Sequence, residues 1–175
     1  MPSSHPVRRV ADSMLPQPLT DAAGRAEARL QEIGVRSRKV ARAEWAALPL
    51  EVQRLVPAWL RELMKAHALL GLVMEKVDLF PDKTRRRLYP FWSPSDFRDV
   101  LLSADPIMEE EIIAEGYVPI SNESDGDQWI TPLNGDANSP ILLFSLSDMK
   151  VFPAFASMTE LMTLMSVSEE STNEA

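Results

Sequence analysis

Apolar residues in the first half of the chain recur every three or four positions, which is the spacing of an amphipathic helix. The longest such run covers residues 52–72 and contains Pro57. Because proline lacks a backbone N–H and disfavours helix in the preceding residue, we expect a break near Val56 and a second helix that ends near Gly71. A narrower apolar stripe predicts an earlier helix over residues 20–33.

After Gly116 the pattern changes to short segments rich in β-branched and aromatic residues, which are typical of strands. The expected strands are residues 117–121, 128–131, 141–146 and 151–155. Turns rich in Asn, Asp, Ser and Gly separate them, and connections this short join antiparallel neighbours. The second half of the chain is therefore expected to form an antiparallel meander.

Two capping patterns predict further helices on either side of these strands. Asp105 and Pro106 fit the cap and the first position of a helix that Gly116 ends. The spacing of Ser157 and Glu160 fits a capping box and predicts a closing helix. The chain is thus expected to have an α+β fold, in which an antiparallel β-sheet is packed by N-terminal helices and a C-terminal helix.

Composition predicts four parts along the chain. They are a flexible tail (1–20), an N-terminal helical extension (21–44), the α+β domain (45–165) and an acidic tail (166–175). A chain of 175 residues suits one domain and can bury enough apolar surface to fold without covalent cross-links. Residues 72–104 are harder to interpret: residues 73–80 alternate partly and fit a strand or a helix extension, residues 88–92 fit a strand interrupted by Pro90, and a short turn is expected before residue 100.

Residue counts exclude several classes of site. The chain has no Cys, which excludes disulfides, thiolate zinc sites, iron–sulfur clusters and cysteine nucleophiles. Its two His are too few for a His-rich metal cage, and no glycine-rich phosphate-binding motif is present. We therefore expect no cofactor and no metal. The longest apolar stretch, residues 68–74, is far below the roughly 20 residues that span a bilayer, so a cytoplasmic protein is expected.

Charge is unevenly distributed along the chain, whose net charge is −8. Residues 1–90 carry 16 basic and 10 acidic side chains, whereas residues 91–175 carry 2 basic and 16 acidic ones. The acidic half would repel nucleic-acid phosphates and attract a basic protein, so no nucleic-acid partner is expected. The run from Glu109 to Glu111 fits a helix start on a solvated face, with a partner-binding patch as the alternative.

Candidate catalytic and metal-binding residues are few. His67 lies at the edge of the apolar stripe, which favours a packed or capping histidine over a general base or a ligand. The polar turn of residues 122–127 does not fit an EF-hand loop, because Pro132 stands where the bidentate Glu is needed. Gly126 instead predicts a hairpin turn with a positive φ angle. Acidic residues are plentiful, but no spacing selects a catalytic pair, so no enzymatic activity is expected.

The segment GYVPISNESDGDQWI, residues 116–130, resembles the SUKH superfamily, the Smi/Knr-type group named from a fungal cell-wall synthesis regulator. The resemblance lies in a Gly, a "VPIS" strand, a polar turn that closes in Gly-Asp, and a returning strand. It continues through the strand at 141–146 and the AFASMTEL segment at 154–161, which is similar to the family's final helix. VPAWL at 56–60 looks like the helix that opens those domains, so the resemblance covers residues 45–165.

Two positions depart from the family pattern. The glycine pair that usually follows the first helix is reduced to Gly71, and Met158 stands where an aromatic residue usually follows the last Ser. The resemblance implies a small α+β domain with an antiparallel sheet packed by helices. Bacterial members of the superfamily include many immunity proteins of polymorphic toxin systems. The resemblance therefore also implies binding to a toxin.

The leading functional hypothesis is a non-enzymatic protein-binding module, most concretely a bacterial immunity protein that neutralises a basic toxin such as a nuclease. The predicted contacts are Glu123, Asp125, Asp127 and Asp136, with Trp129 as an anchor or, alternatively, a core residue of its strand. The alternative is a regulatory or scaffold protein that binds a cellular partner through its N-terminal segment. Deletion of residues 1–44 would then abolish binding. A small hydrolase that uses carboxylates is a third class.

Overall fold

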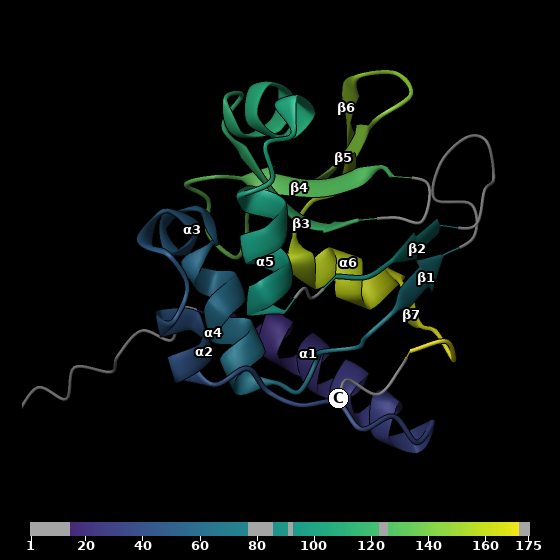
Figure 1. Ribbon diagram of the computed structural model, residues 1–175. Helices are drawn as coiled ribbons and strands as arrows, with labels where there is room; N and C mark the ends of the chain where they lie inside the picture. Colours follow the sequence, from purple (N-terminus) through teal and green to yellow (C-terminus); the bar gives the residue numbers. More distant parts are fainter. Residues whose placement is uncertain (1–14, 77–85, 91–92, 123–125, 172–175) are drawn as a thin grey trace, which may run out of the picture.

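The computed structural model describes residues 15–76, 86–90, 93–122 and 126–171, and Figure 1 shows their arrangement. The helices are α1 (Gln17–Glu32), α2 (Arg42–Ala46), α3 (Leu50–Leu55), α4 (Ala58–Ala66), α5 (Pro94–Leu101), the π-helix η1 (Ile107–Ile113) and α6 (Met158–Leu164). The strands are β1 (Met74–Lys76), β2 (Arg86–Leu88), β3 (Tyr117–Asn122), β4 (Gln128–Pro132), β5 (Ile141–Ser145), β6 (Lys150–Phe155) and β7 (Ser166–Val167). The predicted α+β class is confirmed.

The strands form two antiparallel sheets. β3, β4, β5 and β6 follow one another in a four-stranded meander, as predicted, and each predicted boundary lies within one residue of the observed one. β1 lies between β2 and β7 in a second, three-stranded sheet; a strand over residues 73–80 was one of two alternatives, but this sheet and its pairing were not predicted. Its strands are two or three residues long, which is too short for alternation of apolar and polar residues to decide between a strand and a helix.

Proline divides the long apolar run as predicted. α3 ends at Leu55, Val56 is extended with a ψ angle of 123°, and Pro57 caps α4. α4 ends at Ala66, earlier than expected, because His67 already has an extended backbone with φ −123° and ψ 144°. The apolar face of α4 buries Trp59, Leu60, Leu63 and Met64.

α1 is part of the core rather than an extension of the domain. It begins at Gln17, with Pro18 in its first turn, so it starts before the predicted boundary at residue 20. It packs against α6 and β7 in the same hydrophobic cluster (Figure 1). Its buried residues are Leu19, Ala22, Ala23, Ala26 and Leu30, and the three alanines permit a close approach. The predicted division at residue 44 is therefore corrected.

A polar clamp fixes α1 to the end of α4. Glu27 Oε1 accepts a hydrogen bond from the backbone N–H of Ala68 at 3.1 Å, and Glu27 Oε2 lies 3.0 Å from His67 Nδ1. The side chains of His67 and Glu27 are 13% and 23% exposed. His67 therefore has the packed position at a helix end that its place in the sequence favoured.

Glu27→Ala is expected to lower the free energy of unfolding by about 2 kcal/mol, because the Ala68 N–H and the His67 ring lose their partner in a partly buried place. Chemical denaturation followed by circular dichroism measures this change. Glu32→Ala, on the exposed side of α1 where Glu32 pairs with Arg29, is the matched control and should cost less than about 0.5 kcal/mol. Equal losses for the two variants would contradict the clamp.

The C-terminal segment also belongs to the domain. β7 pairs with β1, and Ser168 and Ser171 beyond it are buried. The Val73 N–H donates to Ser171 Oγ at 3.0 Å, and the Ser168 N–H donates to the Val73 carbonyl at 2.8 Å. The predicted acidic tail over residues 166–175 is therefore corrected, since its described part, residues 166–171, closes the second sheet.

α5 replaces the short turn that was expected in this region. Ser93 Oγ accepts a hydrogen bond from the Asp96 N–H at 3.2 Å, and the Asp96 carboxylate accepts one from the Ser93 N–H at 3.0 Å. This is a capping box in which Asp replaces the usual Glu or Gln. Phe97 is fully buried, and its ring lies 6.0 Å from that of Trp45. The short apolar pattern gave too little periodicity to predict this helix.

The meander carries hydrophobic residues on both faces. One face supplies Trp129, Leu143 and Phe155 to the large core that the α-helices cover. The other face supplies Ile130 and Phe144, which pack with residues of η1 in a smaller cluster. Figure 1 shows η1 above the meander and α6 below it. η1 is thus held at one end of the molecule by apolar contacts with the sheet.

Candidate protein-binding surface

The predicted contact residues do not form one exposed surface. Glu123 and Asp125 lie outside the described residues. Asp127 is only 7% exposed. Its Oδ1 accepts a hydrogen bond from the Leu146 N–H at 2.9 Å, and its Oδ2 lies 3.4 Å from Arg86 Nη1. Asp127 therefore joins the end of β5 to β2, and its prediction as a partner contact is corrected.

Trp129 is buried in the structure, whereas Asp136 is exposed. Trp129 is fully buried and its ring stacks on Phe155 at a centroid distance of 5.8 Å, so the anchor prediction is corrected in favour of a core residue. Asp136 is exposed in the β4–β5 turn. Its Oδ1 accepts a hydrogen bond from the Asn138 N–H at 2.8 Å, and its own N–H donates to Ser139 Oγ at 2.9 Å. Asp136 shapes this turn while staying on the surface.

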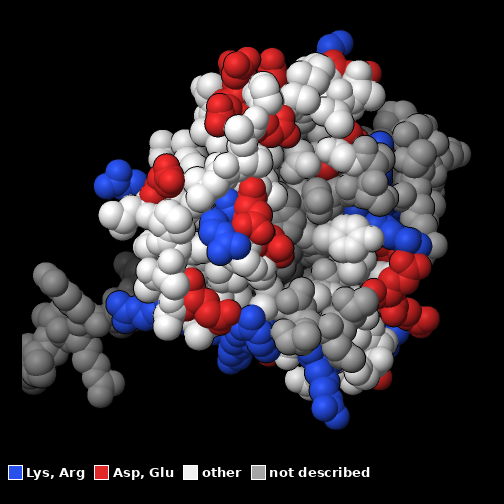
Figure 2. Space-filling view, viewed as in Figure 1, with Lys and Arg blue, Asp and Glu red and all other residues white. Residues whose placement is uncertain are grey.

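The exposed carboxylates gather instead on η1. Asp105 caps this helix by accepting a hydrogen bond from the Ile107 N–H at 3.0 Å. Met108 and Ile112 face the meander and are buried, Ile107 and Ile113 are partly buried beside them, and Glu109–Glu111 face water. The acidic ridge is defined here as the four exposed residues Glu109, Glu110, Glu111 and Glu115. Figure 2 shows acidic side chains gathered over η1 at the top of the molecule.

The charge of the acidic ridge is not neutralised locally. Within the described ranges, none of its four carboxylates forms an ion pair or a side-chain hydrogen bond. Like charges on neighbouring positions of a helix repel one another, which costs stability. A cationic partner would relieve that repulsion. The run Glu109–Glu111 was visible in the sequence. The sequence did not show that apolar contacts with the sheet hold the helix that carries this run.

An exposed apolar hairpin borders the acidic ridge. The turn between β5 and β6 and the first residues of β6 expose Leu146, Met149 and Val151 by 39%, 44% and 38%. We call these three residues the hairpin tip. Val151 lies opposite Phe144, which belongs to the cluster beneath η1. The hairpin and η1 lie at the same end of the molecule in Figure 1. This end therefore combines free carboxylates with exposed apolar side chains.

Met149 holds a strained backbone conformation in the hairpin tip. Its φ angle is +52°, and it is the one non-glycine residue with a positive φ in the described part of the chain. A β-carbon at positive φ clashes with the following carbonyl, so glycine or asparagine is usual there. Strain of this kind is characteristic of functional sites. At Met149, the residue with this strained backbone has an apolar side chain that is exposed to solvent.

Met149→Gly is expected to raise the free energy of unfolding by about 1 kcal/mol, because it relieves the positive-φ strain. The same change should weaken partner capture several-fold, since it removes an apolar contact. Leu146→Ala is the control: it trims the same tip without relieving strain and should not stabilise the protein. Equilibrium denaturation measures both variants, and a Met149→Gly protein no more stable than the unmodified chain would contradict this account.

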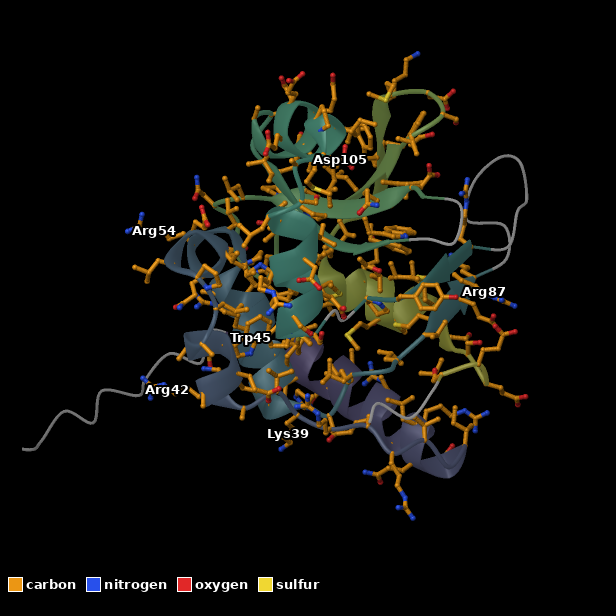
Figure 3. All side chains as sticks on the ribbon, in the orientation of Figure 1. Lys39, Arg42, Trp45, Arg54, Arg87 and Asp105 are labelled. Atoms are coloured by element: carbon orange, nitrogen blue, oxygen red, sulfur yellow. The ribbon has the colours of Figure 1, made fainter. Side chains whose placement is uncertain are left out.

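The opposite end of the molecule carries basic residues and is called the basic end below. Figure 3 shows Lys39 and Arg42 far from Asp105, which lies at the start of η1. These two cations and the carboxylates of η1 thus lie at opposite ends of the fold. Such a separation orients the molecule as it approaches a charged partner.

Among the residues that the structure describes, no group of three or more His, Asp or Glu side chains is placed to hold a metal ion. None of the described helices has the length and apolar character needed to cross a bilayer.

Comparisons with known proteins give no relative of this chain. No protein-family model, no curated protein and no solved structure matches it. The resemblance to the SUKH superfamily stays a prediction that rests on the motifs quoted above. The geometry of the described residues therefore carries the functional argument.

Proposed function

We propose that the chain is a non-enzymatic protein-binding module of the cytoplasm, most concretely a bacterial immunity protein that binds and neutralises a basic toxin. One observation carries this proposal: four exposed carboxylates, unpaired among the residues that the structure describes, lie at the same end of the fold as an exposed apolar hairpin. The proposal moves the docking surface from the turn at residues 122–127 to the acidic ridge and the hairpin tip.

The two parts of this surface have different physical roles. The acidic ridge attracts a cationic surface over several ångströms, which raises the association rate and rejects acidic partners. The hairpin tip supplies apolar area that leaves water on contact and slows dissociation. A nuclease binds the phosphates of its nucleic-acid substrate through cationic side chains, and carboxylates on a helix can pair with those cations instead. Coverage of those cations would block the toxin's substrate.

The environment of the carboxylates favours binding over catalysis. A general acid or base is usually held by a hydrogen-bonded neighbour in a cleft that excludes water. The carboxylates of the acidic ridge lie exposed on η1 and the turn that follows it, without a side-chain partner among the described residues. This arrangement suits recognition of a charged surface.

Capture of the partner from native cells at two salt concentrations tests the proposal. The tagged full-length chain should retain one stoichiometric basic protein at low salt and lose most of it at about 0.5 M salt, where charges are screened within a few ångströms. The captured protein should be toxic on expression and harmless when this chain is co-expressed. A salt-insensitive complex with a housekeeping protein would contradict the immunity proposal and favour the regulatory alternative.

A further inference from the structure

A cavity at the basic end is lined by two residues that each carry a buried hydrogen-bond donor without an acceptor. The cavity has a volume of about 330 Å³ and lies between α2, α3 and α4. Its lining residues include Trp45 and Arg61. Trp45 Nε1 and Arg61 Nε are both buried and have no hydrogen-bond partner in the described part of the chain. Buried donors are nearly always paired, so two unpaired donors at one cavity require an explanation.

The cations around this cavity are only partly neutralised. Lys65 forms an ion pair with Glu62 on the same helix. Arg42 and Arg61 have no carboxylate partner within the described ranges. The lining therefore carries three cationic side chains and one anionic one. The cavity has an excess of positive charge.

A nearby arginine outside the cavity, Arg38, is paired with a carboxylate, unlike the arginines of the lining. Arg38 Nη1 lies 2.9 Å from Glu44 Oε2, and its Nη2 donates to Glu44 Oε1 at 3.0 Å. The bond from Arg38 holds the pKa of the Glu44 carboxyl below its ordinary value. Arg38 is thus matched by an acid of this chain, whereas Arg42 and Arg61 are not.

Arg61 is also reached from a second, larger cavity of about 480 Å³. The two cavities share Gln53 and Arg61, and the larger one extends to the β4–β5 turn at Leu133. Arg54 lines the larger cavity but not the smaller one. Arg61 is therefore accessible from outside although its Nε atom is buried, and Arg54 provides a neighbouring arginine for comparison.

We propose that the smaller cavity binds an oxyanion, the carboxylate or phosphate group of a small molecule. The indole N–H of Trp45 is a donor only, and the guanidinium of Arg61 presents a planar fork of donors that matches two oxygens of one anion. Arg42 supplies further positive charge at the entrance. The volume suits a small ligand. This site lies away from the acidic ridge and stands independently of the proposed function.

Nuclear magnetic resonance of the full-length chain with ¹⁵N-labelled tryptophan tests the proposal. Inorganic phosphate and succinate are titrated separately at constant ionic strength, with chloride as the replaced anion. The Trp45 indole signal, assigned with Trp45→Phe, is expected to shift and saturate. Saturation with phosphate alone identifies a phosphate ligand, with succinate alone a carboxylate ligand, and with both a general oxyanion site. No saturable shift with either probe would overturn the proposal.

Arginine variants separate a specific site from general attraction of anions. Arg61→Met is expected to raise the dissociation constant at least tenfold, and Arg61→Lys, which keeps the charge but loses the fork, at least threefold. Arg54→Gln removes an exposed charge close by and should change it less than twofold. Equal weakening by Arg54→Gln and Arg61→Met would overturn the proposal.

Thermal unfolding distinguishes a ligand-binding arginine from a structural one. Arg61→Met should melt at or above the temperature of the unmodified chain without the probe, because the removed Nε–H has no partner in the described fold. The probe should raise the melting temperature of the unmodified chain and leave that of Arg61→Met unchanged. An equal rise in both proteins would contradict the site.

Discussion

Reversal of Glu109, Glu110 and Glu111 to lysine is expected to weaken partner capture at least about 100-fold, which corresponds to about 3 kcal/mol of binding free energy. The three changes turn an anionic helix face into a cationic one, so attraction to a basic surface becomes repulsion. The side chains are exposed and have no partner within the described ranges, so the fold should stay intact by circular dichroism. Biolayer interferometry with the captured partner measures the change.

A matched control keeps the same change in net charge away from η1. Glu32, Glu51 and Glu169 are exposed residues outside the acidic ridge. Their triple reversal to lysine should weaken capture less than about threefold, because charges beyond a Debye length are largely screened. If the two triple variants weaken capture equally, net charge rather than the acidic ridge determines binding.

Deletion of residues 1–32 is expected to abolish cooperative unfolding. It removes α1, whose buried leucines, Leu19 and Leu30, each contribute about 3 kcal/mol by analogy with leucine-to-alanine changes in cores. Together these two losses approach the total stability of a typical domain, which is about 5–15 kcal/mol. Loss of the Glu27 clamp adds to them. Thermal melts followed by circular dichroism should show no sigmoidal transition.

Deletion of residues 1–14 provides the control, because it leaves α1 and its contacts in place. This variant should unfold cooperatively near the temperature of the full chain. A cooperative transition after deletion of residues 1–32 would contradict the placement of α1 in the core.

The same reasoning changes the test of the regulatory alternative. Deletion of residues 1–44 would remove binding by unfolding the protein, so the informative deletion ends at residue 14.

The parts of the fold that were predicted depend on local chemistry. Pro57 lacks the N–H that a continuous helix needs, and the break follows at Val56. The polar turns between the meander strands fix hairpins between sequence neighbours. Gly126 has the predicted positive φ angle, 92°. Each of these signals lies within a few residues of the structure that it specifies.

The parts that were missed depend on contacts between distant segments. Val73 bonds to Ser171 across 98 positions, so β7 could not be recognised without its partner. α1 appeared to be a loosely packed extension because its alanine-rich face is weakly hydrophobic, yet it fits closely against α6 and β7. Sequence-based boundaries failed where the core is completed from both ends of the chain.

The candidate site was only partly predictable for the same reason. Asp127 lies in a segment whose composition is typical of a surface turn. Its contacts with Arg86 of β2 and with the Leu146 N–H after β5 nevertheless bury it. Trp129 is buried because it lies on the face of the same sheet that packs into the large core. The carboxylates of η1 were visible as a run, while the hairpin tip beside them required the pairing of β5 with β6. Contacts between distant segments decide which of these residues are exposed and which are buried.

Hydrogen exchange of the full chain with and without its captured partner tests the central claim most directly. The account predicts slower exchange on complex formation in η1 and in the segment from Leu146 to Val151. Backbone amides of α2 and α4, at the basic end, should exchange as in the free protein. Protection confined to α2 and α4, with unchanged exchange in η1 and the hairpin tip, would contradict the assignment of the acidic end as the docking surface.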